Sequence, residues 1–167
     1  ILTQDENGRD IIMVGQKSGM VYALDPANNG SLVWERRAGS GGTMGGIHYG
    51  MSSSGEKLFV GVSDLPTNNP YNVGPAHPGV HALKPSTGEI LWRNDLPDKC
   101  EQSQFLCWRG ISAAVSSTAD LVFAGGLDGI LRAFDTDDGE ILWETNTRQS
   151  FGERNGIEAR GGSIEAD

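Results

Sequence analysis

The 167-residue sequence has no long hydrophobic run and few basic side chains. No uncharged apolar stretch approaches the ~20 residues that a membrane-spanning helix needs, so such a helix is excluded. No positively charged segment followed by an apolar one opens the sequence, so no signal peptide is expected within it. Its 13 basic residues are outnumbered by 22 acidic ones. The net charge of −9 disfavours nucleic-acid binding, because phosphate backbones would be repelled.

Metal-ligating side chains are also scarce. The three histidines, His48, His77 and His81, lack the spacing of a metal site and are expected to be structural. The two cysteines, Cys100 and Cys107, do not form a zinc pattern. A local disulfide, which would suit an exported protein, and two free thiols are both compatible with their spacing.

The sequence is instead rich in glycine, with 24 residues, and contains three copies of one pattern. In each copy, two short β-rich apolar runs are followed by a tight turn ending on glycine and then by a tryptophan. The copies occupy residues 11–15, 19–25 and 30–34; residues 57–61, 79–84 and 88–92; and residues 120–125, 129–135 and 139–143. Their tryptophans are 58 and 51 residues apart, within the range typical of β-propeller blades.

A fourth apolar run precedes the second copy at 46–51 and the third copy at 111–115. The repeating unit is therefore interpreted as four antiparallel strands, and the fold class as all-β. Three strands of a first blade are expected within 1–37. Complete blades are expected at 45–96 and 111–147, and the first strand of a fourth blade at 162–167.

The turn and tryptophan of each copy resemble the tryptophan-docking motif of pyrroloquinoline quinone (PQQ) enzyme propellers, Ala-x-Asp-x-x-Thr-Gly-x-x-x-Trp. The copies run from Ala23 to Trp34, from Ala82 to Trp92 and from Ala133 to Trp143. Lys84 stands where the motif has Asp, and the first turn is one residue longer. Segments 121–129 and 155–164 are most similar to the polyvinyl-alcohol-dehydrogenase-like branch.

The resemblance implies β-propeller blades in which Trp34, Trp92 and Trp143 are structural docking residues. Family members close eight blades into a ring, of which this chain would supply about three. The sequence opens on Ile1 without methionine and stops shortly after the strand-like segment 161–164. These features predict a piece of a longer protein, so the expected partners are the remaining blades or further copies of the chain.

Three long connections, 64–78, 94–110 and 146–160, are expected on one face of the propeller, where sites commonly lie. Asp64 matches a family asparagine that ligates calcium beside the quinone, and Asn68 supplies a further amide oxygen. A capped turn is the alternative at Asp64.

In the second connection, Trp108 and Arg109 offer the aromatic face and guanidinium that a quinone tricarboxylate would need. In the third, Arg154, Asn155 and Arg160 are the further cofactor-binding candidates. The alternatives are a tryptophan that packs its loop against the propeller and a solvated polar loop.

The resemblance implies a quinoprotein that binds PQQ and calcium, oxidises an alcohol and passes electrons to a cytochrome. A carboxylate would act as general base. Asp98 and Glu101 are the candidates, although neither matches the family motif. Localisation in the bacterial periplasm, or secretion, is implied. The alternative function is a non-catalytic scaffold for other proteins, resembling the outer-membrane assembly lipoproteins.

Overall fold

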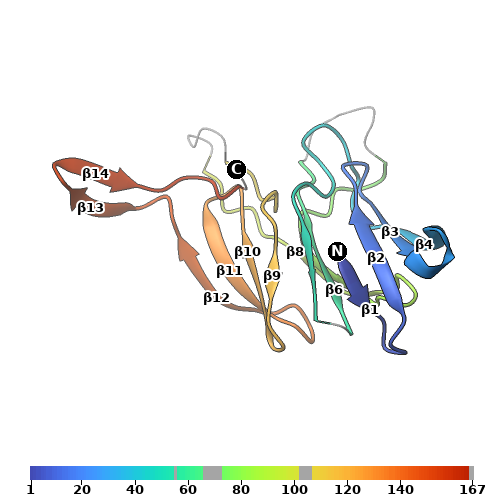
Figure 1. Cartoon of the computed structure of the whole chain (residues 1–167). Coiled ribbons are helices and arrows are strands. Elements are labelled where there is room, and N and C mark those ends of the chain that lie inside the picture. Colours follow the sequence, from blue (N-terminus) through green and yellow to red (C-terminus); the bar gives the residue numbers. More distant parts are fainter. Residues whose placement is uncertain (55, 66–72, 102–106, 166–167) are drawn as a thin grey trace.

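Antiparallel β-sheet makes up most of the regular structure (Figure 1). The computed structural model describes residues 1–54, 56–65, 73–101 and 107–165. Three four-stranded meanders and a two-stranded hairpin follow one another along the chain. No helix in the described part is long and apolar enough to span a membrane.

Each meander pairs its strands in sequence order. The first contains β1 (Leu2–Gln4), β2 (Asp10–Gly15), β3 (Met20–Asp25) and β4 (Ser31–Arg37), with a 3-10 turn, η1 (Pro26–Asn28), between the last two. The second contains β5 (Met51–Ser53), β6 (Leu58–Val62), β7 (Gly79–Leu83) and β8 (Ile90–Asp95). The third contains β9 (Ser116–Ser117), β10 (Leu121–Gly125), β11 (Ile130–Asp135) and β12 (Ile141–Asn146). The hairpin is β13 (Ser150–Arg154) with β14 (Ile157–Arg160).

The middle sheet is covered on both faces, which explains why every residue of β6 and β7 is buried. Successive side chains of a strand point to opposite faces. Leu58 and Val60 therefore pack against the first sheet, whereas Phe59 packs against the third. Two apolar cores result, one on each side of the middle sheet.

Tryptophans join each sheet to the next one. Trp34 Nε1 donates to the carbonyl of Pro85 at 2.7 Å, and Trp92 Nε1 donates to the carbonyl of Thr136 at 3.0 Å. The rings lie against turn glycines: a Cβ added to Gly88 would meet Trp34 at 2.5 Å, and one added to Gly139 would meet Trp92 at 2.5 Å. Trp34 and Trp92 thus each contact the turn of the following sheet, and the sheets are β-propeller blades.

The two ends of this series are open. The Trp143 side chain, which is equivalent to Trp34 and Trp92, is 49% exposed. Gly30, which is equivalent to Gly88 and Gly139, has no atom within 4 Å of an added Cβ. The structure therefore presents a docking tryptophan at one end and a docking turn at the other.

The inner strands differ from the prediction. Residues 2–4 form an additional strand of the first sheet, and β5 and β9 begin later than predicted. Segments 46–50 and 111–115 cross between sheets, so their amides bond to neighbouring connections: Ile47 N donates to Gln16 O, and Ile111 N to Val62 O. The strand predicted from 162 is not formed over the described residues, where Ile164 N donates to Gly126 O instead.

The connection after β12 is also not the irregular loop that was predicted. It folds into the β13–β14 hairpin, with Asn155 (φ 53°) and Gly156 (φ 78°) between the strands. Two consecutive residues at positive φ form the tight turn that asparagine and glycine favour. The Asn-Gly pair was therefore a hairpin signal.

Candidate functional site

The long connections meet at one end of the sheets (Figure 1). Ser63 N donates to Gly46 O at 2.8 Å, and Leu127 N donates to Gly110 O at 2.9 Å. Ile111 N donates to the carbonyl of Val62 at 3.0 Å. The first two bonds link a blade's incoming connection to the segment after the second strand of the same blade, and the third links the incoming connection of the third blade to the second blade. The edges of the predicted connections 64–78 and 94–110 therefore lie close together, whereas most of the third, 146–160, forms the β13–β14 hairpin.

Asp64 follows β6 by two residues and is fully buried. Its Oδ1 accepts backbone N–H bonds from Gly41 (3.2 Å) and Gly46 (2.9 Å). Its Oδ2 accepts from Ser40 (2.6 Å) and His77 (3.0 Å). A carboxylate has about four lone-pair sites, and all are used here. Asp64 thus ties the connection after β4 to the connection before β7.

Calcium does not fit Asp64 as this carboxylate lies, because a bound cation would have to displace its amide donors. The described residues contain no group of three or more histidine, cysteine or acidic side chains suited to a metal ion. Asn68, the other predicted ligand, lies outside the described residues. The surroundings of Asp64 agree with the capped-turn alternative.

Trp108 lines a pocket of about 250 Å³ on the same face. This Trp108 pocket is formed by Met44, Trp108, Leu127, Ser163 and Glu165. Its residues come from four separate connections, so packing of all three blades positions them. The tryptophan and the two apolar side chains offer a surface suited to a flat ring, and Glu165 adds a carboxylate.

His48 lines a separate pocket, together with Ile47 and Met51. Its Nε2 must donate to the carbonyl of Gly45 (3.0 Å), because a carbonyl only accepts. Its Nδ1 shares a second hydrogen bond with the Ser112 hydroxyl (2.9 Å). Burial lowers the pKa of His48, while nearby Glu165 opposes that shift. Both ring nitrogens of His48 are thus occupied by hydrogen bonds within the protein.

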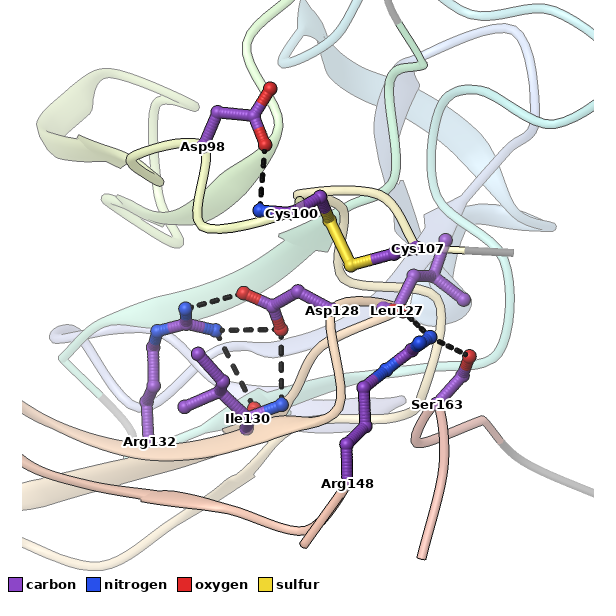
Figure 2. The surroundings of a disulfide bond; sticks show 9 residues. All are labelled: Asp98, Cys100, Cys107, Leu127, Asp128, Ile130, Arg132, Arg148 and Ser163. Atoms are coloured by element: carbon purple, nitrogen blue, oxygen red, sulfur yellow. Dashed lines mark hydrogen bonds and ion pairs between the residues drawn. A yellow bond between two sulfur atoms is a disulfide. The ribbon is translucent and has the colours of Figure 1, made fainter. Parts of the chain in front are cut away.

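A disulfide joins Cys100 and Cys107, which decides between the two alternatives for this pair. Figure 2 shows it close to Leu127 and Asp128. Asp98 Oδ1 accepts the Cys100 amide at 3.1 Å, which stabilises the start of the loop. Trp108 follows the disulfide directly in the sequence, so the bridge fixes the end of the segment that carries the predicted cofactor face.

Side chains of the third blade also contact the loop that the disulfide closes. Lys99 forms an ion pair with Glu144, whose other oxygen lies 3.7 Å from Arg132 Nε. Arg132 and Asp128 are buried and share two hydrogen bonds, at 3.1 and 2.5 Å (Figure 2). Glu144 thus contacts Lys99 on the disulfide loop and Arg132 on β11, and Asp128 balances the charge of the buried Arg132. This network of charged side chains joins the disulfide loop to β11.

Replacing both Cys100 and Cys107 with serine is expected to lower the free energy of unfolding by about 2.5 kcal/mol, because a short closed loop is released. Urea denaturation followed by tryptophan fluorescence measures this. Wild-type protein in excess reductant should show the same loss, and adding reductant to the double variant should change nothing further. Equal midpoints for variant and wild type would contradict the anchoring role.

The other predicted site residues do not gather at the Trp108 pocket. Asp98 and Glu101 are exposed on the disulfide loop and are not among its lining residues. Arg109 Nη1 donates to the carbonyl of Leu96 at 3.3 Å. Asn155 forms the hairpin turn, and Arg160 Nε contacts Glu158 at 3.0 Å.

The hairpin that carries Asn155, Arg160 and the backbone of Arg154 projects away from the three sheets (Figure 1). The structure therefore does not bring these residues to Trp108.

A second pocket, of about 300 Å³, was not predicted from the sequence. This His77 pocket is lined by Arg37, Ala38, Gly39, Val73, Gly74, Pro75, His77 and Arg93. It lies between the ends of β4, the segment before β7, and β8. No sequence motif pointed to it, because its basic side chains come from three separate segments.

Two histidines and an aspartate adjoin the His77 pocket. His77 Nδ1 lies 2.8 Å from Asp95 Oδ2, and His81 Nε2 lies 3.5 Å from Asp95 Oδ1. The contact with His81 and the hydrogen bond with His77 lower the pKa of Asp95 to about 2. Burial lowers the pKa of His81, whose fully buried ring has no well-formed hydrogen bond. Asp95 is therefore ionised between two imidazole rings.

Comparison with known proteins places the chain in a family. A family model described as outer membrane protein assembly factor BamB matches residues 17–161. A polyvinylalcohol dehydrogenase of Pseudomonas sp is 43% identical over 148 residues, which is 88% of this chain and 22% of that protein. A second one, of Sphingopyxis sp. (strain 113P3), is 41% identical over 143 residues, which is 84% of this chain and 21% of that protein.

Solved structures agree at the level of the fold. A europium-containing methanol dehydrogenase superposes with a TM-score of 0.60 and 18% identity, over 84% of this chain and 23% of that one. The chain spans about a fifth of the length of the two polyvinylalcohol dehydrogenases. Since the family model covers most of the sequence, this chain belongs to the PQQ_2 family, described as outer membrane protein assembly factor BamB.

Proposed function

We propose that this chain is part of a quinoprotein dehydrogenase-like propeller that binds PQQ and oxidises an alcohol. The observation that carries the proposal is the similarity to two polyvinylalcohol dehydrogenases over more than four fifths of the chain. Because the chain spans only part of those proteins, the activity belongs to the whole propeller. The Trp108 pocket supports the proposal, because it combines an aromatic face with apolar walls on the face where the connections meet.

In this proposal, Trp108 stacks on the cofactor ring while Met44 and Leu127 exclude water from it. PQQ, when bound, supplies a quinone that takes up a hydride from the alcohol carbon. A carboxylate takes the hydroxyl proton, and Asp98 and Glu101 remain the predicted candidates on the adjoining loop. Arg109, next to Trp108, remains a predicted cofactor ligand; Arg154, Asn155 and Arg160 lie on the projecting hairpin, so this proposal assigns them no cofactor contact. The proposal assigns no step to calcium, since Asp64 does not fit that ion.

The proposed setting is the bacterial periplasm or the exterior, with a cytochrome as electron acceptor. The disulfide between Cys100 and Cys107 supports an oxidising compartment.

Titration of PQQ into the chain, with and without calcium, tests the cofactor proposal. Saturable quenching of tryptophan fluorescence and matching calorimetric heats are expected. Trp108→Ala should weaken binding about tenfold, because a stacking face is lost. Trp143→Ala is the matched control, since this tryptophan is half-exposed on β12 and outside the pocket. Absence of saturable binding by folded protein, or equal weakening in both variants, would refute the proposal.

The open ends of the series favour a second candidate role, that of a scaffold. Leu142 and Trp143 are 53% and 49% exposed on β12. We propose that Trp143 docks on a turn like that of Gly88, supplied by a remaining blade of the longer protein or by a further copy. Light scattering measures the assembly. Folded protein that assembles through Trp143 but fails to bind PQQ would favour the scaffold role over the dehydrogenase.

A further inference from the structure

The His77 pocket gathers basic side chains in an acidic protein. Arg37, His77 and Arg93 line it, and none of its eight lining residues is acidic. The chain as a whole carries a net charge of −9. Local basic side chains in an acidic background are a feature of binding sites for anions, because they attract the ligand against the general repulsion.

The His77 ring is held in one orientation. The Asp95 carboxylate can only accept, so the 2.8 Å contact means that Nδ1 of His77 carries the hydrogen. The structure shows no protein partner for Nε2 among the described residues, and the ring lines the pocket. Asp95 is ionised, and its other oxygen, Oδ1, lies 3.5 Å from His81 Nε2. The His77 ring is therefore held in one orientation in the wall of the pocket, where its signals would respond to a bound ligand.

Hydrogen bonds already hold the segments that line the pocket together without a ligand. Asp64 Oδ2 accepts the amides of both Ser40 and His77, one from each side of the pocket. On the first side, Arg37 Nη1 donates to the carbonyls of Ser18 (2.7 Å) and Gly39 (3.2 Å). A guanidinium has five N–H donors, so Arg37 retains others. Binding would thus require little ordering of the backbone.

The remaining lining distinguishes between kinds of anion. Ala38, Val73 and Pro75 add apolar lining to the charged groups of the pocket. Inorganic phosphate is polar on all sides and gains nothing from such a wall. A carboxylate with a short hydrocarbon body can use the cationic groups and the apolar wall together.

We propose that the His77 pocket binds a small organic carboxylate, with the Arg93 guanidinium on the carboxylate and Val73 and Pro75 against its hydrocarbon part. This site shares no lining residue with the Trp108 pocket, so it does not depend on PQQ binding.

Butyrate titrated into the protein tests the proposal, with calorimetry for affinity and nitrogen-15 NMR for the His77 ring. Saturable binding and a shift of the His77 imidazole signals are expected with butyrate, and neither is expected with butylamine. Arg93→Gln should weaken butyrate binding about tenfold, because a charge-assisted donor pair is lost. Arg93→Lys, which keeps the charge but not the fork, should fall between wild type and Arg93→Gln.

Arg160→Gln is the matched control, since it removes the same charge from an exposed hairpin position. It should change butyrate affinity less than twofold, because non-specific attraction is screened by salt. Equal weakening in Arg93→Gln and Arg160→Gln would overturn the proposal. Phosphate binding as tightly as butyrate would also overturn it, and so would a wild-type protein whose His77 signals do not respond.

Discussion

Replacing Trp34 with alanine is expected to lower the free energy of unfolding by about 3–5 kcal/mol. The side chain is only 9% exposed, and its ring fills the space between the first and second sheets. Its loss would leave a cavity against Gly88 and deprive the Pro85 carbonyl of its donor. Guanidinium denaturation measures this loss, because the free energy of unfolding follows from the transition midpoint and from the dependence of that free energy on denaturant concentration.

Trp143→Ala is the matched control for this experiment. It deletes the same side chain from the equivalent position, but that side chain is 49% exposed. The expected loss is below about 1 kcal/mol, because little buried area disappears. Trp34→Phe should show an intermediate loss, since it keeps an aromatic ring without the indole donor. If alanine cost the same at both tryptophans, docking between blades would not be the source of the stability.

Asp64→Ala is expected to lower the free energy of unfolding by about 3–5 kcal/mol, through loss of a buried acceptor of several hydrogen bonds. Four backbone N–H groups, those of Ser40, Gly41, Gly46 and His77, would lose their partner together. Asp64→Asn should cost less, about 2 kcal/mol, because one oxygen still accepts its hydrogen bonds. The remaining cost arises because the new NH2 group faces backbone N–H donors and cannot accept from them. Thermal or chemical denaturation measures both variants.

Asp98→Ala is the control for Asp64, because Asp98 is exposed and accepts one amide. Its expected loss is below about 1 kcal/mol. Denaturation with calcium and with a chelator separates the two roles considered for Asp64. A structural clamp predicts the same wild-type midpoint in both conditions. A wild-type midpoint that falls with chelator by as much as Asp64→Ala loses would establish the metal role instead.

The parts of the fold that repeat could be predicted from the sequence. The three turns with their tryptophans placed β2, β3, β6, β7, β10 and β11 to within a few residues, because glycine turns and apolar alternation are local signals. The inner strands could not be placed as well. Segments such as 46–50 bond to neighbouring blades rather than along a ladder, and that choice depends on tertiary contacts.

The candidate site could be predicted only in part. The shared face of the connections followed from the order of the strands, and Trp108 lies in a pocket there. The amides around Asp64 come from two other segments, so no local pattern announces them. The His77 pocket was missed for the same reason. The hairpin at 150–160 was different: Asn155 and Gly156 carried a recognisable turn signal that was interpreted as cofactor chemistry.

The docking bonds between blades all run in one direction along the chain. Trp34 of the first blade bonds to the turn of the second, and Trp92 of the second bonds to the turn of the third. The middle blade thus both receives and gives a docking contact, whereas each outer blade takes part in one. Opening an outer blade breaks one junction, but opening the middle blade breaks two. Structural fluctuations should therefore begin at the outer blades and reach the middle one last, in the manner of a one-dimensional array with nearest-neighbour coupling.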